Sequence, residues 1–331
     1  MNANTINRAM KRTIKCGVAA LAVAMAGQAA AQSYPNKGIL MVVPLATASA
    51  TDVVMRIVTQ KMGENMGQQF AIENIPGAAG MLGGENVARA APDGYTIGGF
   101  SDAVVNGVPL LYPNVPYDPF TSFAPVGLTA WVTFVMMSHP SLPVKNAKEF
   151  VALAKSQKDP MDYASGGSGS PMHLAMEVFK SMTGVKLNHI PYRGSITGVL
   201  DVMAGRVPVM ITSLAPVLEN IRAGKVRALG ITSLQRSPLL PEVPTVNESG
   251  VKGFTYATWQ AIYAPRNTPR PIIDRLHAEM VKAVNDPGVK DRLIKSALEP
   301  ATSTPEQLAA QTRSGYDKIA KIIKDAGIKA D

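Results

Sequence analysis

Two kinds of hydrophobic pattern take turns near the start of the chain: continuous apolar runs, typical of buried strands, and apolar residues at helical spacing. Residues 39–44 form a continuous apolar run, which predicts a strand buried on both faces, as in a parallel sheet. Thr51 and Asp52 then supply N-cap side chains, and apolar residues recur at helical spacing over 53–62 until Gly67 ends the pattern. The same cycle predicts further elements in this part of the chain, namely strands at 70–72 and 95–100 and a helix that ends near residue 90.

A second alternating block follows a proline-rich, helix-poor stretch at 112–125. A strand-like segment at 131–137 leads into this block, and another at 256–264 leads out of it, so we place two domain crossings near Ala130 and Gly253. Between the crossings we predict helices at 147–156, 172–183, 195–204 and 216–223 and strands at 161–164, 187–191, 207–212 and 226–232. Two longer helices, at 271–284 and 305–326, close the chain.

This order of elements predicts an α/β fold class with two α/β domains, joined by two crossings around a central cleft. The predicted parts are a first lobe at 33–130, a second lobe at 131–252 and a return to the first lobe at 253–331. In open α/β sheets, ligands bind in the crevice beyond the carboxyl ends of the strands. We therefore expect the loops at 44–51 and 165–170 to face each other across the cleft.

The loop at 165–170 carries the strongest chemical signal, because a strand end opens into a helix through glycines and serines. Glycine lets the backbone approach a ligand closely, and the first N–H groups of a helix lack partners and carry partial positive charge. A carboxylate or phosphate fits such a position. An ordinary capped surface loop has the same composition, so the residues alone leave both interpretations open.

The N-terminal segment 1–31 is typical of a cleaved secretory signal peptide. Basic residues precede an uncharged run at 16–26, and small residues lead to a cleavage position after Ala31. The run is too short to span a membrane, and Cys16 is the only cysteine of the chain. These features predict a periplasmic protein without disulfides. The formal net charge of +9 falls once this basic segment is removed, and no basic stripe suggests a nucleic-acid partner.

Enzyme, metal and nucleotide chemistry receive little support from the motifs. Ser170 and His173 stand three residues apart and form the one candidate dyad for a secreted serine hydrolase, yet the surrounding sequence lacks the G-x-S-x-G pattern. The four histidines show no metal-ligand spacing, and no glycine motif matches a dinucleotide or phosphate loop. We therefore expect no catalytic residues, no metal and no cofactor.

Several spaced motifs resemble those of Bug-type extracytoplasmic solute receptors, which serve tripartite tricarboxylate transporters. The resemblance runs over nearly the whole chain after the signal peptide, from Tyr34 to Ile328. It is carried by Glu-Asn-Ile-Pro-Gly-Ala-Ala-Gly at 73–80, Pro-Asp-Gly-Tyr-Thr at 92–96, Tyr-Asp-Pro at 117–119, the loop and helix start at 165–173, and His-Ile-Pro-Tyr-Arg-Gly at 189–194.

This resemblance implies a two-lobed periplasmic-binding-protein fold, similar to type II, that closes on a small carboxylate held by backbone N–H groups and hydroxyls. It also implies membrane transporter subunits as partners and a monomeric receptor, although a sensor that signals to another partner has the same sequence features. The residues expected at the ligand are Thr47, Ala48, Ser49, Ala50 and Thr51 in the first lobe, and Ser165, Gly166, Gly167, Gly169, Ser170, His173 and Tyr192 in the second.

The first loop departs from the family pattern P-F-A-P-G-G-x-x-D, because Ala48 and Ser49 replace both glycines. Positive φ is costly for alanine, so we expect this loop either to differ in shape or to have no positive φ at Ala48. Val108 likewise stands where the family commonly has asparagine. We interpret these changes as a retuned ligand preference, toward an aromatic dicarboxylate such as terephthalate.

Overall fold

The computed structural model of the chain describes residues 34–328. The predicted signal peptide, with Cys16 and the cleavage position after Ala31, lies outside the described residues. Within residues 34–328, no helix combines the length and the apolar character that a membrane crossing requires.

The first lobe contains a parallel sheet core with helices packed against it. Its N-terminal elements are β1 (Ile39–Val43), α2 (Ala50–Met66), β2 (Phe70–Asn74), η1 (Ala78–Gly80), α3 (Met81–Ala88), β3 (Thr96–Ser101), η2 (Ala103–Gly107) and α4 (Val108–Leu111). β1 lies between β2 and β3 and pairs in parallel with both. The apolar run at 39–44 and the helical pattern at 53–62 therefore predicted β1 and α2 correctly.

The second lobe repeats the alternation of strand and helix. Its elements are α5 (Ala147–Ser156), β5 (Met161–Ser165), α6 (Pro171–Thr183), β6 (Leu187–Pro191), α7 (Ser195–Met203), β7 (Val209–Ser213), η3 (Ala215–Val217), α8 (Leu218–Arg222) and β8 (Arg227–Ile231). β5 pairs in parallel with β6 and β7. The chain then returns to the first lobe through β9 (Ala257–Pro265), α9 (Arg270–Asn285), α10 (Pro287–Lys295), β10 (Leu298–Pro300) and α11 (Pro305–Ala326).

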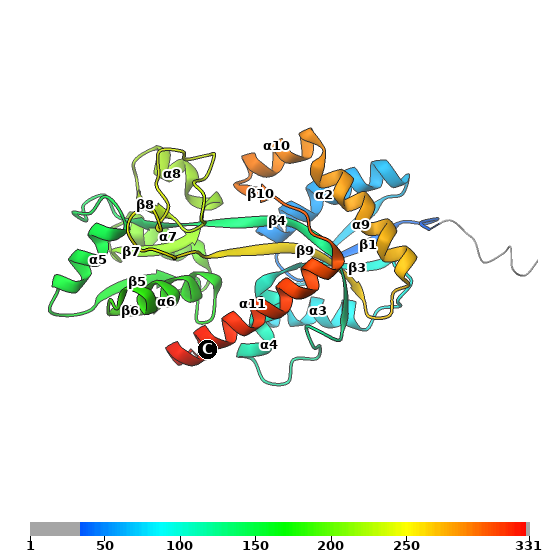
Figure 1. Ribbon diagram of the computed structural model, residues 1–331, viewed down its shortest axis with the longest axis horizontal. Helices are drawn as coiled ribbons and strands as arrows, with labels where there is room; N and C mark the ends of the chain where they lie inside the picture. The colour runs from blue at the N-terminus through cyan, green and yellow to red at the C-terminus, as the bar shows by residue number, and fades with distance from the viewer. Residues whose placement is uncertain (1–33, 329–331) are drawn as a thin grey trace, which may run out of the picture. The chain divides into compact units, whose positions relative to one another are not determined.

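One long strand, β4 (Phe123–Ser138), belongs to the sheets of both lobes. Its first part pairs with β9 and β10, and its last part pairs with β7 and β8. Figure 1 shows β4 and β9 running between the two groups of elements, with α11 lying along them. This arrangement confirms the predicted two-lobed α/β fold, while the boundaries near Ala130 and Gly253 stay predictions.

The strand predicted at 131–137 is longer than expected, since β4 begins at Phe123. The proline-rich stretch argued against a strand there. Pro125 is accommodated because the ladder between β4 and β9 shifts register between Pro125 and Gly127, and prolines are tolerated at such irregularities. The short strand β10, which pairs with β4, was not predicted.

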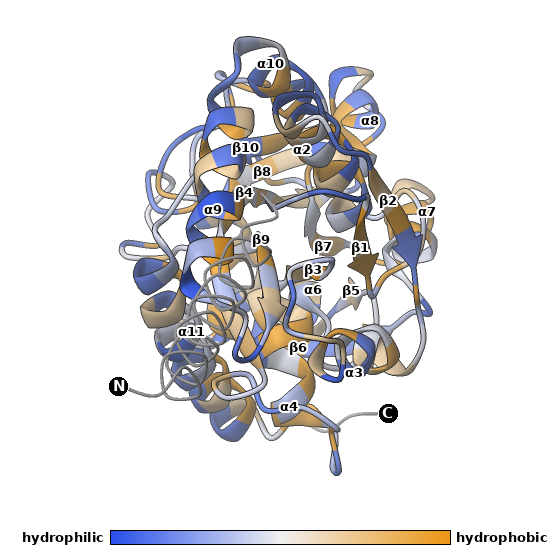
Figure 2. Cartoon of the chain, turned by 90° about the vertical axis from the view of Figure 1, so that its right-hand side faces the viewer, coloured by the Kyte–Doolittle hydropathy of each residue, from blue (hydrophilic) through white to orange (hydrophobic). Residues whose placement is uncertain are grey.

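Each lobe has its own apolar core. In the first lobe, Phe100, Phe123 and Tyr263 pack together, with ring centroids of Phe100 and Phe123 5.1 Å apart. In the second lobe, Ala164 and Met210 belong to a separate buried cluster. Figure 2 shows that the strands in the interior are apolar, whereas the helices around them carry both polar and apolar residues. This is the pattern expected for buried sheets covered by amphipathic helices. The cores hold the strand ends, and with them the loops, in place.

Candidate functional site

The second-lobe loop has the strand, turn and helix geometry that its sequence predicts. β5 ends at Ser165 and α6 begins at Pro171, with Ser170 as N-cap. The Ser170 side chain accepts a hydrogen bond of 3.3 Å from the backbone N–H of His173. Gly167 and Gly169 have φ of 118° and 72°, values that residues with a side chain rarely adopt. Glycine at these two positions therefore shapes the loop.

Ser165 and His173 lie behind the loop and support it from the protein side. Ser165 is fully buried, and its Oγ shares a hydrogen bond of 2.6 Å with His189 Nε2 and accepts one of 3.1 Å from the Gly167 N–H. His173 Nδ1 accepts a hydrogen bond of 3.0 Å from the Gly169 N–H. The imidazole rings of His173 and His189 stack with centroids 3.9 Å apart. These contacts fix the backbone that would meet a ligand.

The side chain of Tyr192 is engaged within its own lobe. Its hydroxyl donates a hydrogen bond of 2.7 Å to Asp201 Oδ2, and its backbone N–H donates one of 3.2 Å to the Ser165 carbonyl. Burial, together with the hydrogen bond and negative charge of Asp201, raises the pKa of Tyr192 to about 12. The Tyr192 side chain is thus held by Asp201 beside the loop, and its predicted contact with a ligand stays a prediction.

The first-lobe loop keeps a left-handed residue where the family pattern has glycine. Ala48 has φ of 64°, which contradicts one of the two expected alternatives, a loop without positive φ at this position. A local hydrogen bond accounts for the conformation, because the Ala48 N–H donates to Asp52 Oδ2 at 2.9 Å. Ser49 is the N-cap of α2 and accepts a hydrogen bond from the Asp52 N–H. Ala50 is the first residue of α2.

The hydroxyls expected to bind ligand in this loop differ in their surroundings. Thr51 is buried, and its hydroxyl donates a hydrogen bond of 2.6 Å to Gln260 Oε1. Thr47 is exposed, and its hydroxyl lies 3.4 Å from Asn74 Oδ1. Thr51 therefore anchors α2 to β9, whereas Thr47 remains at the surface of the loop.

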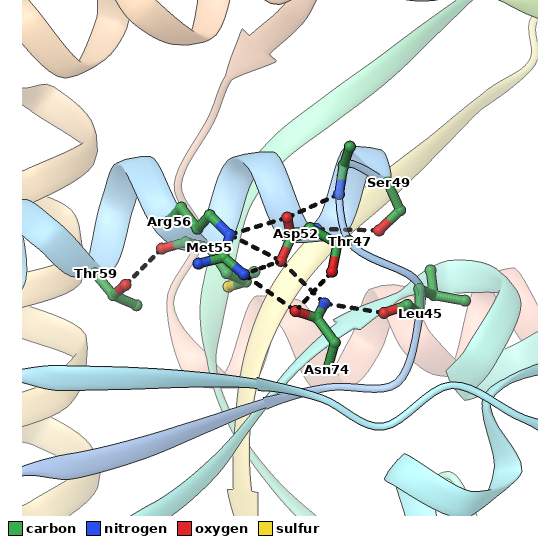
Figure 3. Close-up of polar contacts among 9 residues, drawn as sticks. Leu45, Thr47, Ser49, Asp52, Met55, Arg56, Thr59 and Asn74 are labelled. Carbon is green, nitrogen blue, oxygen red and sulfur yellow. Dashed lines mark hydrogen bonds and ion pairs between the residues drawn. The ribbon is translucent and has the colours of Figure 1, made fainter.

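Asp52 organises the start of α2, as Figure 3 shows. Its carboxylate accepts hydrogen bonds from Arg56, from Asn74 and from the Ala48 N–H. Burial alone would raise the pKa of Asp52, but the hydrogen bonds from Arg56, Ala48 and Asn74 and the positive charge of Arg56 outweigh it and hold the pKa below its usual value. Asp52 is thus occupied by protein partners. The prediction that Thr51 and Asp52 supply the N-cap is wrong, because Ser49 caps α2 and both residues lie in its first turn.

A cavity of about 360 Å³ lies between the lobes and includes parts of both loops. The second-lobe loop contributes Gly166, Ser168, Gly169 and Ser170, and the first-lobe loop contributes Leu45. Of the predicted ligand contacts, Gly166, Gly169 and Ser170 therefore meet at this cavity. Among the described residues that line it, none comes from 47–51, and Ser165, Gly167, His173 and Tyr192 are also absent.

The opposite wall of this cavity was not predicted. It consists of residues from η2 and α4 with their flanking residues, from β9 with the residue before it, and from α11. They include Asp102, Val108, Leu111, Tyr112, Tyr256, Thr258 and Ile319. Leu111 approaches the glycine loop closely, since a Cβ added at Gly169 would lie 2.4 Å from Leu111 Cδ1. The departure from the family pattern at Val108 was the one sequence signal that pointed to this wall.

The contacts of Ser170 and His173 favour a capping role over a catalytic one. Ser170 Oγ faces the backbone N–H of His173, while His173 Nδ1 accepts from Gly169 and Nε2 lies 3.8 Å from Glu177 Oε1. A serine nucleophile needs its hydroxyl hydrogen-bonded to the imidazole that acts as base.

Within residues 34–328, no group of three histidine, aspartate or glutamate side chains is arranged to hold a metal ion.

Comparison with known proteins agrees with this geometry. Residues 54–328 match the protein family described as tripartite tricarboxylate transporter family receptor. BugT of Bordetella pertussis is 32% identical over 324 residues, which are 97% of this chain and 99% of BugT.

Two solved structures extend the likeness to three dimensions. The periplasmic binding protein BugD has a TM-score of 0.76 and 34% identity, and covers 90% of this chain and 100% of its own. Rpa4515 of R. palustris with adipate has a TM-score of 0.80 and 30% identity over the same shares of the two chains. This chain belongs to the tripartite tricarboxylate transporter receptor family, a family of periplasmic solute-binding receptors that includes the Bug proteins.

Proposed function

We propose that this receptor captures a small carboxylate between its lobes and presents it to the membrane subunits of a tripartite tricarboxylate-type transporter. The single observation that carries the proposal is the cavity of about 360 Å³ shared by the glycine loop at the start of α6 and the first lobe. Its volume lies within the range of small-molecule sites. The adipate in the related Rpa4515 structure supports a carboxylate ligand here.

The donors at this cavity suit an anion without a basic side chain. None of the described residues that line it is lysine, arginine or histidine. Gly166, Gly169 and Ser170 instead place the start of α6 beside the cavity, where the positive end of the helix dipole favours a negative charge. A charge-assisted hydrogen bond requires only a neutral donor aimed at the carboxylate.

Closure of the lobes is part of the proposal. A ligand stabilises the closed form only by contacting both lobes better in that form, and the cavity has walls from both. We place the bending near Ala130 and Gly253, supported by the shift in the β4 and β9 ladder between Leu128 and Ala130. Irregularities of this kind bend and twist a strand locally.

The finer parts of the proposal concern ligand identity and context. We propose an aromatic dicarboxylate such as terephthalate as one candidate, supported by the altered first loop and by Tyr112 and Tyr256 in the cavity wall. We also propose export through the signal peptide at 1–31 and a monomeric receptor. A panel of aliphatic and aromatic mono-, di- and tricarboxylates in a thermal-shift assay tests the ligand class.

The decisive experiment compares two variants at Ser170 that both keep the N-cap. Ser170→Asp and Ser170→Asn have nearly the same shape, and both residues cap helices well. A carboxylate at 100 times its Kd stabilises the wild-type protein by about 2.7 kcal/mol. We expect Ser170→Asn to retain most of this gain and Ser170→Asp to lose it, because its negative charge repels the ligand. Equal stabilisation of the two variants would place the carboxylate elsewhere.

A further inference from the structure

An acidic side chain, Asp102, lines the cavity from the first-lobe side. Asp102 directly precedes η2 and is half-buried. It also lines an adjoining cavity of about 690 Å³. A carboxylate in the wall of a site for carboxylates is unexpected, because two ionised carboxylates at close range repel each other.

The protein partners of Asp102 leave part of its carboxylate open to a ligand. Asp102 Oδ1 accepts a hydrogen bond of 2.8 Å from Asn106 Nδ2. Lys318 of α11 lines the adjoining cavity and acts on Asp102 through its charge, and Glu299 of β10 lines that cavity too. Burial raises the pKa of Asp102 to about 6, although the Asn106 hydrogen bond and the Lys318 charge oppose this rise. An ionised carboxylate has about four acceptor positions, so one hydrogen bond leaves most of them unused.

Tyr256 lines the same two cavities as Asp102. Its side chain is buried, and the pKa of its hydroxyl is raised by burial and by the charge of Asp102. No group within residues 34–328 forms a hydrogen bond with this hydroxyl. Asp102 and Tyr256 thus form a polar pair at the cavity that the protein itself leaves incompletely paired.

Closure of the lobes over a ligand would remove water from this pair. A buried polar group without a partner is costly, and a buried unpaired charge costs more. A ligand group that donates a hydrogen bond to Asp102 would offset most of this desolvation cost. A second ionised carboxylate provides no such donor and adds repulsion, so it would bind only with a proton shared between it and Asp102.

We infer that the ligand carries a hydrogen-bond donor, a hydroxyl or an ammonium group, which Asp102 accepts while the ligand carboxylate lies on the glycine loop. This inference rests on the proposed function, narrows its ligand class to hydroxy- and amino-carboxylates, and thereby ranks them above the bare aromatic dicarboxylate named there as one candidate. It predicts that a bare dicarboxylate such as terephthalate binds more weakly than an analogue of the same length in which a donor replaces the second carboxylate.

Two matched ligand series test this inference by titration calorimetry. The aromatic series is benzoate, 4-hydroxybenzoate, 4-(aminomethyl)benzoate and terephthalate, and the aliphatic series is hexanoate, 6-hydroxyhexanoate, 6-aminohexanoate and adipate. In at least one series we expect the wild-type protein to bind a donor-bearing member about tenfold or more tightly than both the unsubstituted acid and the diacid. The hydroxy and amino members then distinguish a neutral donor from a cation.

Variants at the polar pair separate this inference from the proposed function. Asp102→Asn should abolish the preference for donor-bearing ligands and strengthen diacid binding, whereas the exposed control Asp159→Asn should leave both unchanged. Tyr256→Phe removes one hydroxyl and should reduce the preference, which provides a test should Asp102→Asn fail to fold. Tight diacid binding by the wild-type protein, or an equal effect of Asp102→Asn on all members, would overturn the inference alone. Binding of no carboxylate at all would overturn the proposed function with it.

Discussion

Ala48 offers a direct test of how the first loop is held, because it has φ of 64° without being glycine. A left-handed conformation costs a residue with a Cβ about 1–2 kcal/mol. Ala48→Gly removes this cost but adds about 0.4–1 kcal/mol of conformational freedom to the unfolded chain. The Ala48 side chain is exposed, and its N–H bond to Asp52 needs no side chain, so no other contact should change. We therefore expect Ala48→Gly to raise the free energy of unfolding by about 0.5–1 kcal/mol.

Urea denaturation followed by circular dichroism measures this difference. With a slope of about 2 kcal/mol per molar urea, the midpoint should rise by about 0.25–0.5 M. The matched control is Ala50→Gly, two residues later at the first position of α2, where glycine should lower stability by up to about 1 kcal/mol. A lower midpoint for Ala48→Gly, similar to that of the control, would refute the argument that Ala48 is strained.

Three further predictions address residues beside the cavity. Tyr192→Phe should lower the free energy of unfolding by about 1 kcal/mol, through loss of the hydrogen bond to Asp201, and leave carboxylate affinity unchanged; a large loss of affinity would make Tyr192 a ligand contact. Because the pKa of Asp102 is raised to about 6 in the folded protein, the folded state holds its proton more tightly, and the contribution of Asp102 to stability should decline as pH rises from about 4 to 6. Subtracting the pH profile of Asp102→Asn isolates this contribution, and identical profiles would contradict it. A fluorophosphonate probe should not label Ser170 in the folded protein, whereas labelling seen by mass spectrometry would support the hydrolase alternative.

Much of the fold could be predicted from sequence because buried parallel strands leave a strong local signal. The apolar run at 39–44 and the glycine loop after 165 both report on structure formed by neighbouring residues. β10 was not predicted because its three residues carry no strand pattern of their own and form a strand only by pairing with β4. The early start of β4 was hidden for a similar reason, since pairing with β9 overrides the local preference of Pro125.

The candidate site could be predicted only in part. Gly166, Gly169 and Ser170 were found because loop chemistry and helix start coincide there, and they line the cavity. Asp102 and Tyr256 were missed, since they are brought to the same cavity by long-range packing of η2 and the segment before β9. Thr51 looked like a free hydroxyl in the sequence, but its partner Gln260 is distant along the chain.

The sharing of β4 between two sheets has a consequence for how the molecule loses its structure. Melting of either lobe would strip one part of this strand of its ladder partners, β9 and β10 on one side or β7 and β8 on the other. Buried backbone N–H and C=O groups that lose their hydrogen-bond partners raise the free energy of the partly unfolded state. Unfolding of one lobe therefore destabilises the other. The two halves should therefore melt together in one cooperative transition, despite having separate cores.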